Sequence, residues 1–216
     1  MLTEKTTAGV FDRLFAGVPA FELPEELRTE LIRKSIHALI ALVPTIAALA
    51  GAEAALGLLA AGSIVYTYAE TMRRAGRRIT IISRVTALAS RQRDLDRFVL
   101  GPLTLALGAM MALMLYPATI AAIAIYALAF GDGLSSVVGK FWGQTVFPFT
   151  GGKTLEGSLA CMLAVLVSTY TVTGKGLESL AIAVSATLLE MLPTKDMDNF
   201  ILPVGVGAVA TLVLVL

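Results

Sequence analysis

Long apolar stretches alternate with shorter polar segments along this 216-residue chain. The apolar stretches cover residues 35–51, 54–69, 98–116, 118–131, 157–173, 177–192 and 200–216. A helix needs about 20 predominantly apolar residues to cross the hydrocarbon core of a bilayer. The pattern therefore predicts an all-α, polytopic integral membrane protein with about seven transmembrane helices.

The fourth stretch, residues 118–131, is short for a membrane crossing, which predicts that its helix continues past Asp132. Residues 1–34 are polar with some amphipathic character, and we expect them to lie in the membrane interface or to form a loosely ordered tail. Pro24 is well placed to open a helix, because proline is favoured at the first helical position. The expected organisation is an N-terminal interfacial segment, 1–34, and a single transmembrane domain, 35–216.

Composition supports the membrane assignment. Hydrophobic residues make up 56% of the chain and charged residues 15%, with a mean hydropathy of +0.80. Soluble domains carry about 25% charged residues. The net charge of +1 gives no reason to expect a nucleic-acid partner. Cys161 is the only cysteine, so no disulfide can form within the chain.

The positions of the basic residues predict the orientation. Arg33 and Lys34 precede the first stretch, and eight arginines against two aspartates lie between Thr71 and Phe98. Basic residues stay on the cytoplasmic side, which places the N-terminus and the polar segments 132–156 and 193–199 there. We expect the arginine-rich segment, 71–98, to bind anionic lipid headgroups, at about 1 kcal/mol for each cation.

The segment TGGKTLEGS, residues 150–158, ends like a phosphate-binding P-loop, but Phe147 occupies the position where that loop needs its first glycine. A phosphate site of another kind is still expected here. Lys153 can meet a phosphate as a point charge, and the N–H groups of a helix starting after it can add to the same site. The alternative is a lysine extended to the membrane surface with a first-turn glutamate, Glu156.

A second polar motif, GDGLSSVVGKFWG, precedes this segment. Asp132, Ser135, Gly139 and Gly143 are spaced three, four and four residues apart, so they share one helical face. The glycines suit either close helix packing or the approach of a ligand to bare backbone. A carboxylate at the end of a transmembrane helix is costly and usually functional, so Asp132 is a candidate site residue.

Three further groups complete the candidate set. Arg33 and His37 share a helical face at the inner end of the first stretch, where a structural role for the histidine is the alternative. Glu190 lies near the inner end of the sixth stretch, where an unpaired charge is unfavourable. Asp198 and Asn199 supply oxygen ligands of the kind Mg²⁺ prefers, whereas an ordinary solvated loop explains Asp196 adequately.

These motifs together resemble the nucleotide-binding signature of the CTP-dependent lipid kinases, which include dolichol kinase, phytol kinase and a CTP-dependent diacylglycerol kinase. The matching positions are Asp132, Gly139, Gly143, Lys153, Thr154, Glu156 and Gly157. Ser135 replaces an alanine, and Gly152 replaces the first of two lysines. The likeness extends to RKSIHA, residues 33–38, and LLEMLPTKDMDNFILP, residues 188–203.

The resemblance implies transfer of the γ-phosphate of CTP to a membrane lipid alcohol, such as a polyprenol, a phytol-type isoprenoid or diacylglycerol, with Mg²⁺ or another divalent cation. The expected catalytic residues are Asp132, Lys153, Glu190 and Asp198. The expected nucleotide-binding residues are Arg33, Lys34, Ser135, Gly139, Gly143, Lys153, Thr154, Glu156, Gly157 and Asn199. The expected metal ligands are Asp132, Glu156 and Asp198.

Two other functions are considered. A cytidylyltransferase would make a CDP-lipid, and the phosphatidate cytidylyltransferases resemble this chain distantly, but their late His-Gly-Gly pattern is missing because His37 is the sole histidine. A small transporter is disfavoured, because its polar residues would lie near the middle of the membrane. We expect a multi-pass protein of a prokaryotic plasma membrane or a eukaryotic reticulum or plastid membrane, with its active site facing the cytosol, and leave a homodimer open.

Overall fold

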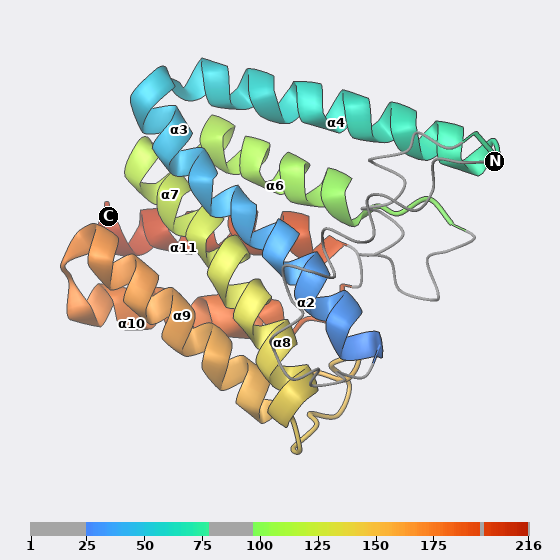
Figure 1. The fold of residues 1–216 in the computed structure, drawn as a ribbon. Coiled ribbons are helices and arrows are strands. Elements are labelled where there is room, and N and C mark those ends of the chain that lie inside the picture. The colour runs from blue at the N-terminus through green and yellow to red at the C-terminus, as the bar shows by residue number, and fades with distance from the viewer. Residues whose placement is uncertain (1–24, 78–96, 195–196, 216) are drawn as a thin grey trace, which may run out of the picture.

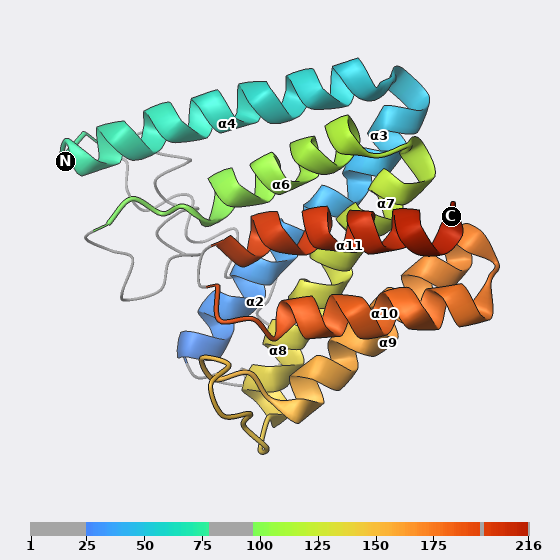
Figure 2. The same ribbon diagram turned by 180° about the vertical axis from the view of Figure 1, so that it is seen from behind.

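The computed structural model describes residues 25–77, 97–194 and 197–215, and every regular element among them is helical. Figures 1 and 2 show these elements from opposite sides. In chain order they are α2 (Glu25–Ala38), the 3₁₀ turn η1 (Leu39–Leu42), α3 (Val43–Ala50), α4 (Ala52–Arg74), α6 (Gly101–Leu115), α7 (Ala118–Tyr126), the π-helical η3 (Ala127–Asp132), α8 (Gly133–Trp142), α9 (Leu155–Thr173), α10 (Gly176–Glu190) and α11 (Asp198–Leu214). The all-α fold class is confirmed for this part of the chain.

Four helical segments are long and apolar enough to cross a membrane. They are Leu27–Ala50, Ala52–Arg74, Ala118–Trp142 and Leu155–Thr173, and Gly101–Leu115 and Asp198–Leu214 are shorter apolar helices. The chain thus has the helices of an integral membrane protein, whereas seven crossings and the cytoplasmic N-terminus stay predictions. The interfacial helix expected before residue 25, residues 78–96 of the arginine-rich segment, and Asp196 lie outside the described residues.

The fourth apolar stretch does continue past Asp132, as predicted. Elements α7, η3 and α8 form one helical segment, Ala118–Trp142, interrupted only by the π-helical turn. Such a turn departs from the regular hydrogen-bond ladder and is frequent at functional sites. The Leu128 carbonyl in this turn accepts a hydrogen bond of 2.9 Å from His37 Nε2. The π-helical turn is thereby tied to α2, and Asp132 lies at its end.

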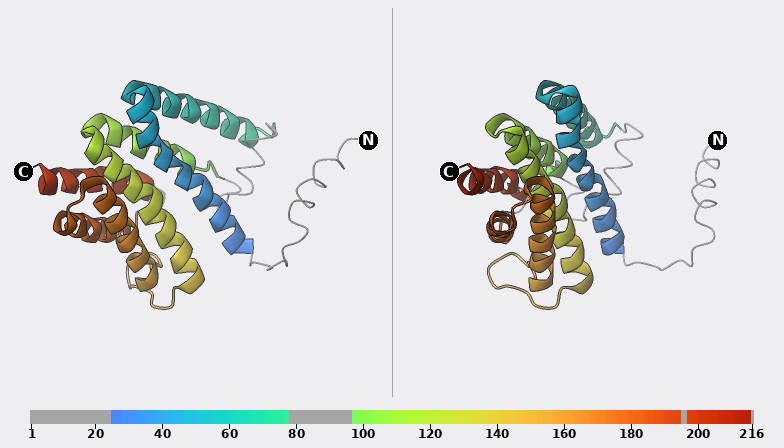
Figure 3. Two further views of the ribbon diagram at one scale, coloured as in Figure 1. Left: turned by 60° about the vertical axis from the view of Figure 1, so that its left-hand side comes forward. Right: turned by 90° about the vertical axis from the view of Figure 1, so that its left-hand side faces the viewer.

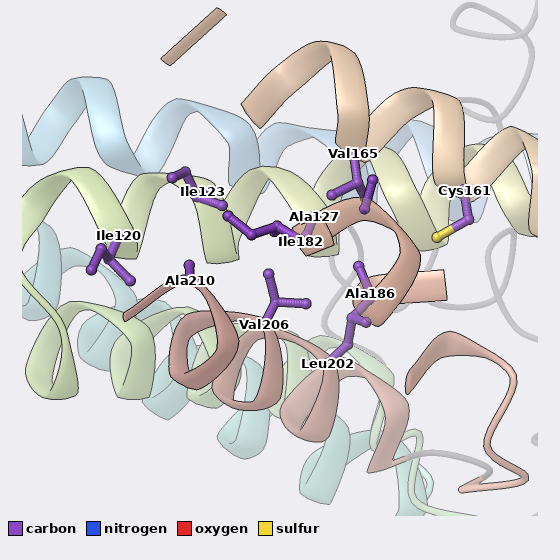
Figure 4. Packing of buried hydrophobic residues seen from close by; sticks show 11 residues of the cluster. Ile120, Ile123, Ala127, Cys161, Val165, Ile182, Ala186, Leu202, Val206 and Ala210 are labelled. Atoms are coloured by element: carbon purple, nitrogen blue, oxygen red, sulfur yellow. The ribbon is translucent and has the colours of Figure 1, made fainter. Parts of the chain in front are cut away.

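Apolar packing holds the second half of the bundle together (Figure 4). Ile123 of α7, Val165 of α9, Ile182 of α10 and Val206 of α11 are at most 1% exposed and belong to one cluster. A second cluster joins α3, α4, α6 and α7. Tight van der Waals packing of this kind is what associates helices where lipid replaces water. Helix α7 contributes to both clusters and is therefore central to the fold.

One end of the molecule collects the polar helix termini. Figure 3 shows the N-terminal end of α2, the C-terminal end of α8 and the N-terminal end of α9 at the same end of the bundle. The polar loop 143–154 joins α8 to α9 there. This arrangement agrees with the sequence expectation that the polar segments gather on one face.

Glycines allow α8 and α9 to approach closely at this end. A Cβ atom on Gly157 would lie 2.8 Å from the Ser135 carbonyl oxygen and 3.3 Å from the Gly139 Cα. A Cβ atom on Gly143 would lie 2.6 Å from Thr154 Cγ2. Helix packing, one of the two roles considered for the face of Ser135, Gly139 and Gly143, therefore accounts for Gly143, and the same packing accounts for Gly157 on α9.

Gly157→Ala should destabilise the protein, because the new methyl group meets backbone that cannot move without separating α8 from α9. Overpacking of this kind costs about 1–3 kcal/mol. Thermal unfolding of the detergent-solubilised protein measures the change. Gly57→Ala is the matched control, since Gly57 lies on exposed α4 with nothing within 4 Å of its added Cβ. Equal stability of the two variants would contradict the packing assigned to Gly157.

Candidate active site

A cavity of about 570 Å³ lies where α2, α6, α8, α10, α11 and the loop 143–154 meet. Small-molecule sites commonly have volumes of about 300–1,000 Å³. The predicted site residues in its lining are Arg33, Ser135, Gly139, Lys153, Thr154, Glu190, Asp198 and Asn199. Residues from five separate parts of the sequence thus contribute to one cavity, as the sequence analysis expected of a shared site.

Lys153 and Glu190 form the central ion pair of the cavity. Ser135 Oγ donates a 2.7 Å hydrogen bond to Glu190 Oε1, the same oxygen that contacts the Lys153 amine. Glu190 is only 2% exposed, and its second oxygen, Oε2, is buried without a hydrogen-bond partner among the described residues. A buried polar atom without a partner is unfavourable, so the Glu190 carboxylate retains the capacity to accept a further hydrogen bond.

The charge state of Lys153 follows from its neighbours. Burial by itself lowers the pKa of the amine, but the Glu190 carboxylate, followed by Asp132 and Asp198, raises that pKa above its ordinary value. Lys153 is therefore a cation at neutral pH. The influence of both aspartates on this amine also places Asp132, Lys153 and Asp198 within electrostatic reach of one another, although they come from three distant positions in the sequence.

The loop before α9 presents Lys153 through a hairpin-like backbone. Phe147 N–H donates to the Lys153 carbonyl at 2.9 Å, and Lys153 N–H donates to Thr150 Oγ1 at 3.2 Å. Gly151 and Gly152 both have positive φ, 73° and 99°, in a region that favours glycine. The glycine at 152, where the resembling signature has lysine, therefore suits the backbone of this turn.

Thr154 caps the N-terminus of α9, and this cap bears on the anion site predicted there. Gly157 N–H donates to Thr154 Oγ1 at 3.2 Å, and Leu155 N–H donates to the Thr145 carbonyl at 2.9 Å. These N–H groups of the helix start are already bonded within the protein, so they do not form the open anion site that was predicted. Glu156 accepts from Thr145 N–H at 3.3 Å and is not in the cavity lining.

Asp132 lies next to the cavity but is not part of its lining. Its carboxylate is 4% exposed and pairs with Lys34, which is 5% exposed, and His37 Nε2 lies 3.4 Å from Asp132 Oδ2. Two buried charges that pair across helices stabilise each other, whereas either one alone would be costly. Lys34 therefore contacts Asp132 and does not line the cavity, although it was expected to bind the nucleotide.

The three expected metal ligands do not form one group. Within the described ranges, no set of three or more His, Cys, Asp or Glu side chains is arranged to hold a metal ion. Asp132 is bound to Lys34, and Glu156 is bound to the Thr145 backbone. Asp198 is the remaining expected ligand, and it lines the cavity without an ion pair in the described part of the chain.

The start of α11 holds Asp198 in place through its neighbour. Asp198 Oδ1 accepts a 3.0 Å hydrogen bond from Asn199 N–H. The Asn199 side-chain amide donates to Thr104 Oγ1 at 3.2 Å and to the Gly101 carbonyl at 3.3 Å. Asn199 therefore connects α11 to α6 and fixes the position at which Asp198 enters the cavity.

Two charged residues of the cavity were missed by the sequence analysis, Glu30 and Lys140. Glu30 is 1% exposed and pairs with Arg33 and with Lys140 Nζ, the latter at 3.1 Å. A usable signal existed, because Glu30, Arg33 and His37 follow helical spacing on one face. Helix α2 runs without interruption from Glu25 to Ala38 and carries all three.

Substitutions at Lys34 and Asp132 should be strongly coupled, because each residue neutralises the other inside the protein. We expect Asp132→Asn and Lys34→Met each to cost up to about 3–5 kcal/mol, since each leaves one buried charge unpaired. The double variant should be more stable than the sum of the two losses predicts, by at least about 1 kcal/mol. Thermal unfolding of the four proteins in one detergent measures the coupling, and additive losses would contradict the ion pair.

Comparison with known proteins does not assign the chain to a family. No protein-family model matches the chain, and neither a curated protein nor a solved structure matches it. The functional conclusion therefore depends on the residues of the cavity and on the sequence motifs that supply them.

Proposed function

We propose that the protein is a CTP-dependent kinase of a membrane lipid alcohol, with the active site at the cavity described above. One observation carries the proposal: Lys153, Glu190 and Asp198 line a single cavity, and Glu190 has a buried oxygen without a hydrogen-bond partner among the described residues. These are three of the four catalytic residues implied by the lipid-kinase resemblance. The preference for CTP comes from that resemblance.

The charges around the cavity suit a metal-bound polyphosphate. Among the described residues, the lining contains three cations, Arg33, Lys140 and Lys153, and three carboxylates, Glu30, Glu190 and Asp198. The formal charges of these six side chains cancel, so a bound triphosphate needs additional positive charge. Mg²⁺ is commonly held by one or two carboxylates together with substrate phosphates, so a cage of three carboxylates is unnecessary.

Asp198 fits this role, because it lines the cavity and makes no ion pair in the described part of the chain. When bound, the divalent cation would neutralise phosphate charge, and Asp198 would be its protein ligand. Lys153 and Arg33 would bind the phosphate oxygens directly. Phosphoryl transfer depends mainly on this kind of positioning and charge neutralisation.

Glu190 is better suited than Asp132 to act as the general base. The acceptor hydroxyl oxygen attacks the γ-phosphorus, the bond to the β,γ-bridging oxygen breaks, and CDP leaves. The hydroxyl proton passes to the Glu190 carboxylate, which lines the cavity and whose Oε2 has no partner among the described residues. Asp132 is less suitable, because it pairs with Lys34 and does not line the cavity. A positioned base contributes about 10²–10⁴-fold to such a reaction.

The proposed phosphate acceptor is a lipid alcohol that lies in the membrane around the protein. Seven crossings with a cytoplasmic N-terminus would place the cavity at the inner leaflet, where the hydroxyl of a polyprenol, a phytol-type isoprenoid or diacylglycerol lies level with the headgroups. Apolar side chains cover the outside of the helices, including Leu58, Ile64 and Val65 of α4. On this proposal the acceptor lipid would enter the site from the bilayer, between helices.

Glu190→Gln should abolish most phosphorylation, lowering kcat about 100- to 10,000-fold, because the amide cannot accept the hydroxyl proton. Purified protein in lipid nanodiscs is given CTP, ATP or GTP with each lipid alcohol in turn, and lipid phosphate and CDP are quantified. Glu178→Gln is the matched control, since Glu178 lies in the first turn of the same helix and should keep full activity.

The products also test the reaction class. Release of pyrophosphate with formation of a CDP-lipid would replace the kinase by a cytidylyltransferase. Flux of a solute across liposomes without nucleotide consumption would indicate a transporter. Wild-type turnover by Glu190→Gln would remove the base assigned here.

A further inference from the structure

We propose that Lys140 and Arg33 together form a second phosphate-binding pair of cations, and that Glu30 is the residue that positions both. The inference rests on the proposed function, since it names further residues for the same polyphosphate. The sequence motifs did not single out Lys140 or Glu30.

Glu30 connects two helices through its two carboxylate oxygens. Oε1 pairs with Arg33 one turn further along α2, and Oε2 lies 3.1 Å from Lys140 Nζ of α8. The carboxylate is 1% exposed, so both cations are held against a buried anion. One carboxylate cannot neutralise two cations, and the trio therefore keeps one net positive charge beside the cavity.

The two cations are accessible although their anchor is not. The side chains of Arg33 and Lys140 are 29% and 35% exposed, and both line the cavity with Glu30. Arg33 Nε is buried and has no hydrogen-bond partner among the described residues. Guanidinium groups bind phosphate through several parallel N–H donors, so the exposed part of the Arg33 side chain at the cavity wall suits a phosphate oxygen.

The arrangement favours an extended polyanion over a single small anion. Arg33, Lys140 and Lys153 come from α2, α8 and the loop before α9, so they surround the cavity from three elements. Lys153 is paired with Glu190, while Arg33 and Lys140 share Glu30. In this proposal a polyphosphate contacts all three cations, and Glu30 holds two of them against one carboxylate.

The test measures nucleotide binding separately from catalysis. Equilibrium dialysis of labelled CTP against protein in nanodiscs gives Kd for the wild type, Lys140→Ala, Lys140→Arg and Lys175→Ala. We expect Lys140→Ala to weaken binding about tenfold, because a charge-assisted contact is lost, and Lys140→Arg to restore most of it. Lys175→Ala is the control, since this exposed lysine precedes α10 at the opposite end of the molecule.

Glu30→Gln tests the positioning role through a split between kcat and KM. The variant removes an anion that competes with phosphate for both cations, so KM for CTP should stay constant or fall. Turnover should drop about tenfold, because Arg33 and Lys140 lose the anchor that sets their positions. A merely structural role would lower the amount of folded protein and leave both constants of the folded fraction unchanged.

The outcomes separate this inference from the proposed function. If wild-type protein phosphorylates a lipid and Lys140→Ala binds CTP as tightly as Lys175→Ala, the second cation pair is overturned while the kinase assignment stands. If the wild type neither binds CTP nor phosphorylates any lipid alcohol, both are overturned. Should Glu30→Gln fail to fold, the Lys140 variants decide, because that side chain is partly exposed and its loss leaves the core intact.

Discussion

Charges that are buried among apolar helices need a partner, and this requirement determines how the polar end of the bundle is assembled. Lys34 meets Asp132 across 98 positions of sequence, and Lys153 meets Glu190 across 37. Removing one partner of such a pair leaves an uncompensated charge in a medium that solvates it poorly. The pairs therefore hold α2, the π-helical turn, the loop before α9 and the end of α10 in one arrangement.

The two central pairs serve different purposes because their surroundings differ. Asp132 is enclosed, with Lys34 on one side and His37 on the other, and it joins α2 to the π-helical turn. Glu190 lines the cavity, and only one of its oxygens is bonded in the described structure. An enclosed pair supports the frame, whereas a pair at a cavity can exchange its partner for a ligand. Close packing of α8 and α9 at Gly157 brings the loop that carries Lys153 near Glu190, so that the ion pair at the cavity can form.

Much of this arrangement could be predicted from the pattern of apolar and polar residues. The helical segments, the continuation past Asp132, and the gathering of Arg33, Lys153 and Asp198 at one end follow from where apolar stretches begin and end. Other expectations did not hold, because they depended on contacts that no spacing encodes. The sequence predicted an anion site at the N–H groups that start α9. In the structure these groups donate hydrogen bonds to Thr154 and to the loop before α9 instead.

The sequence by itself therefore determined the helical architecture of the described residues, with helices apolar enough to cross a membrane, and the end of the bundle at which the polar residues gather. These properties depend on hydrophobicity and helical period, which are local along the chain. Tertiary structure alone decided that Asp132 pairs with Lys34, that Glu190 lines the cavity, and that Glu30 holds two cations there. The physical reason is that the pairing of buried charges depends on how each helix is rotated and how closely it packs against its neighbours, and neither quantity is a property of a single segment.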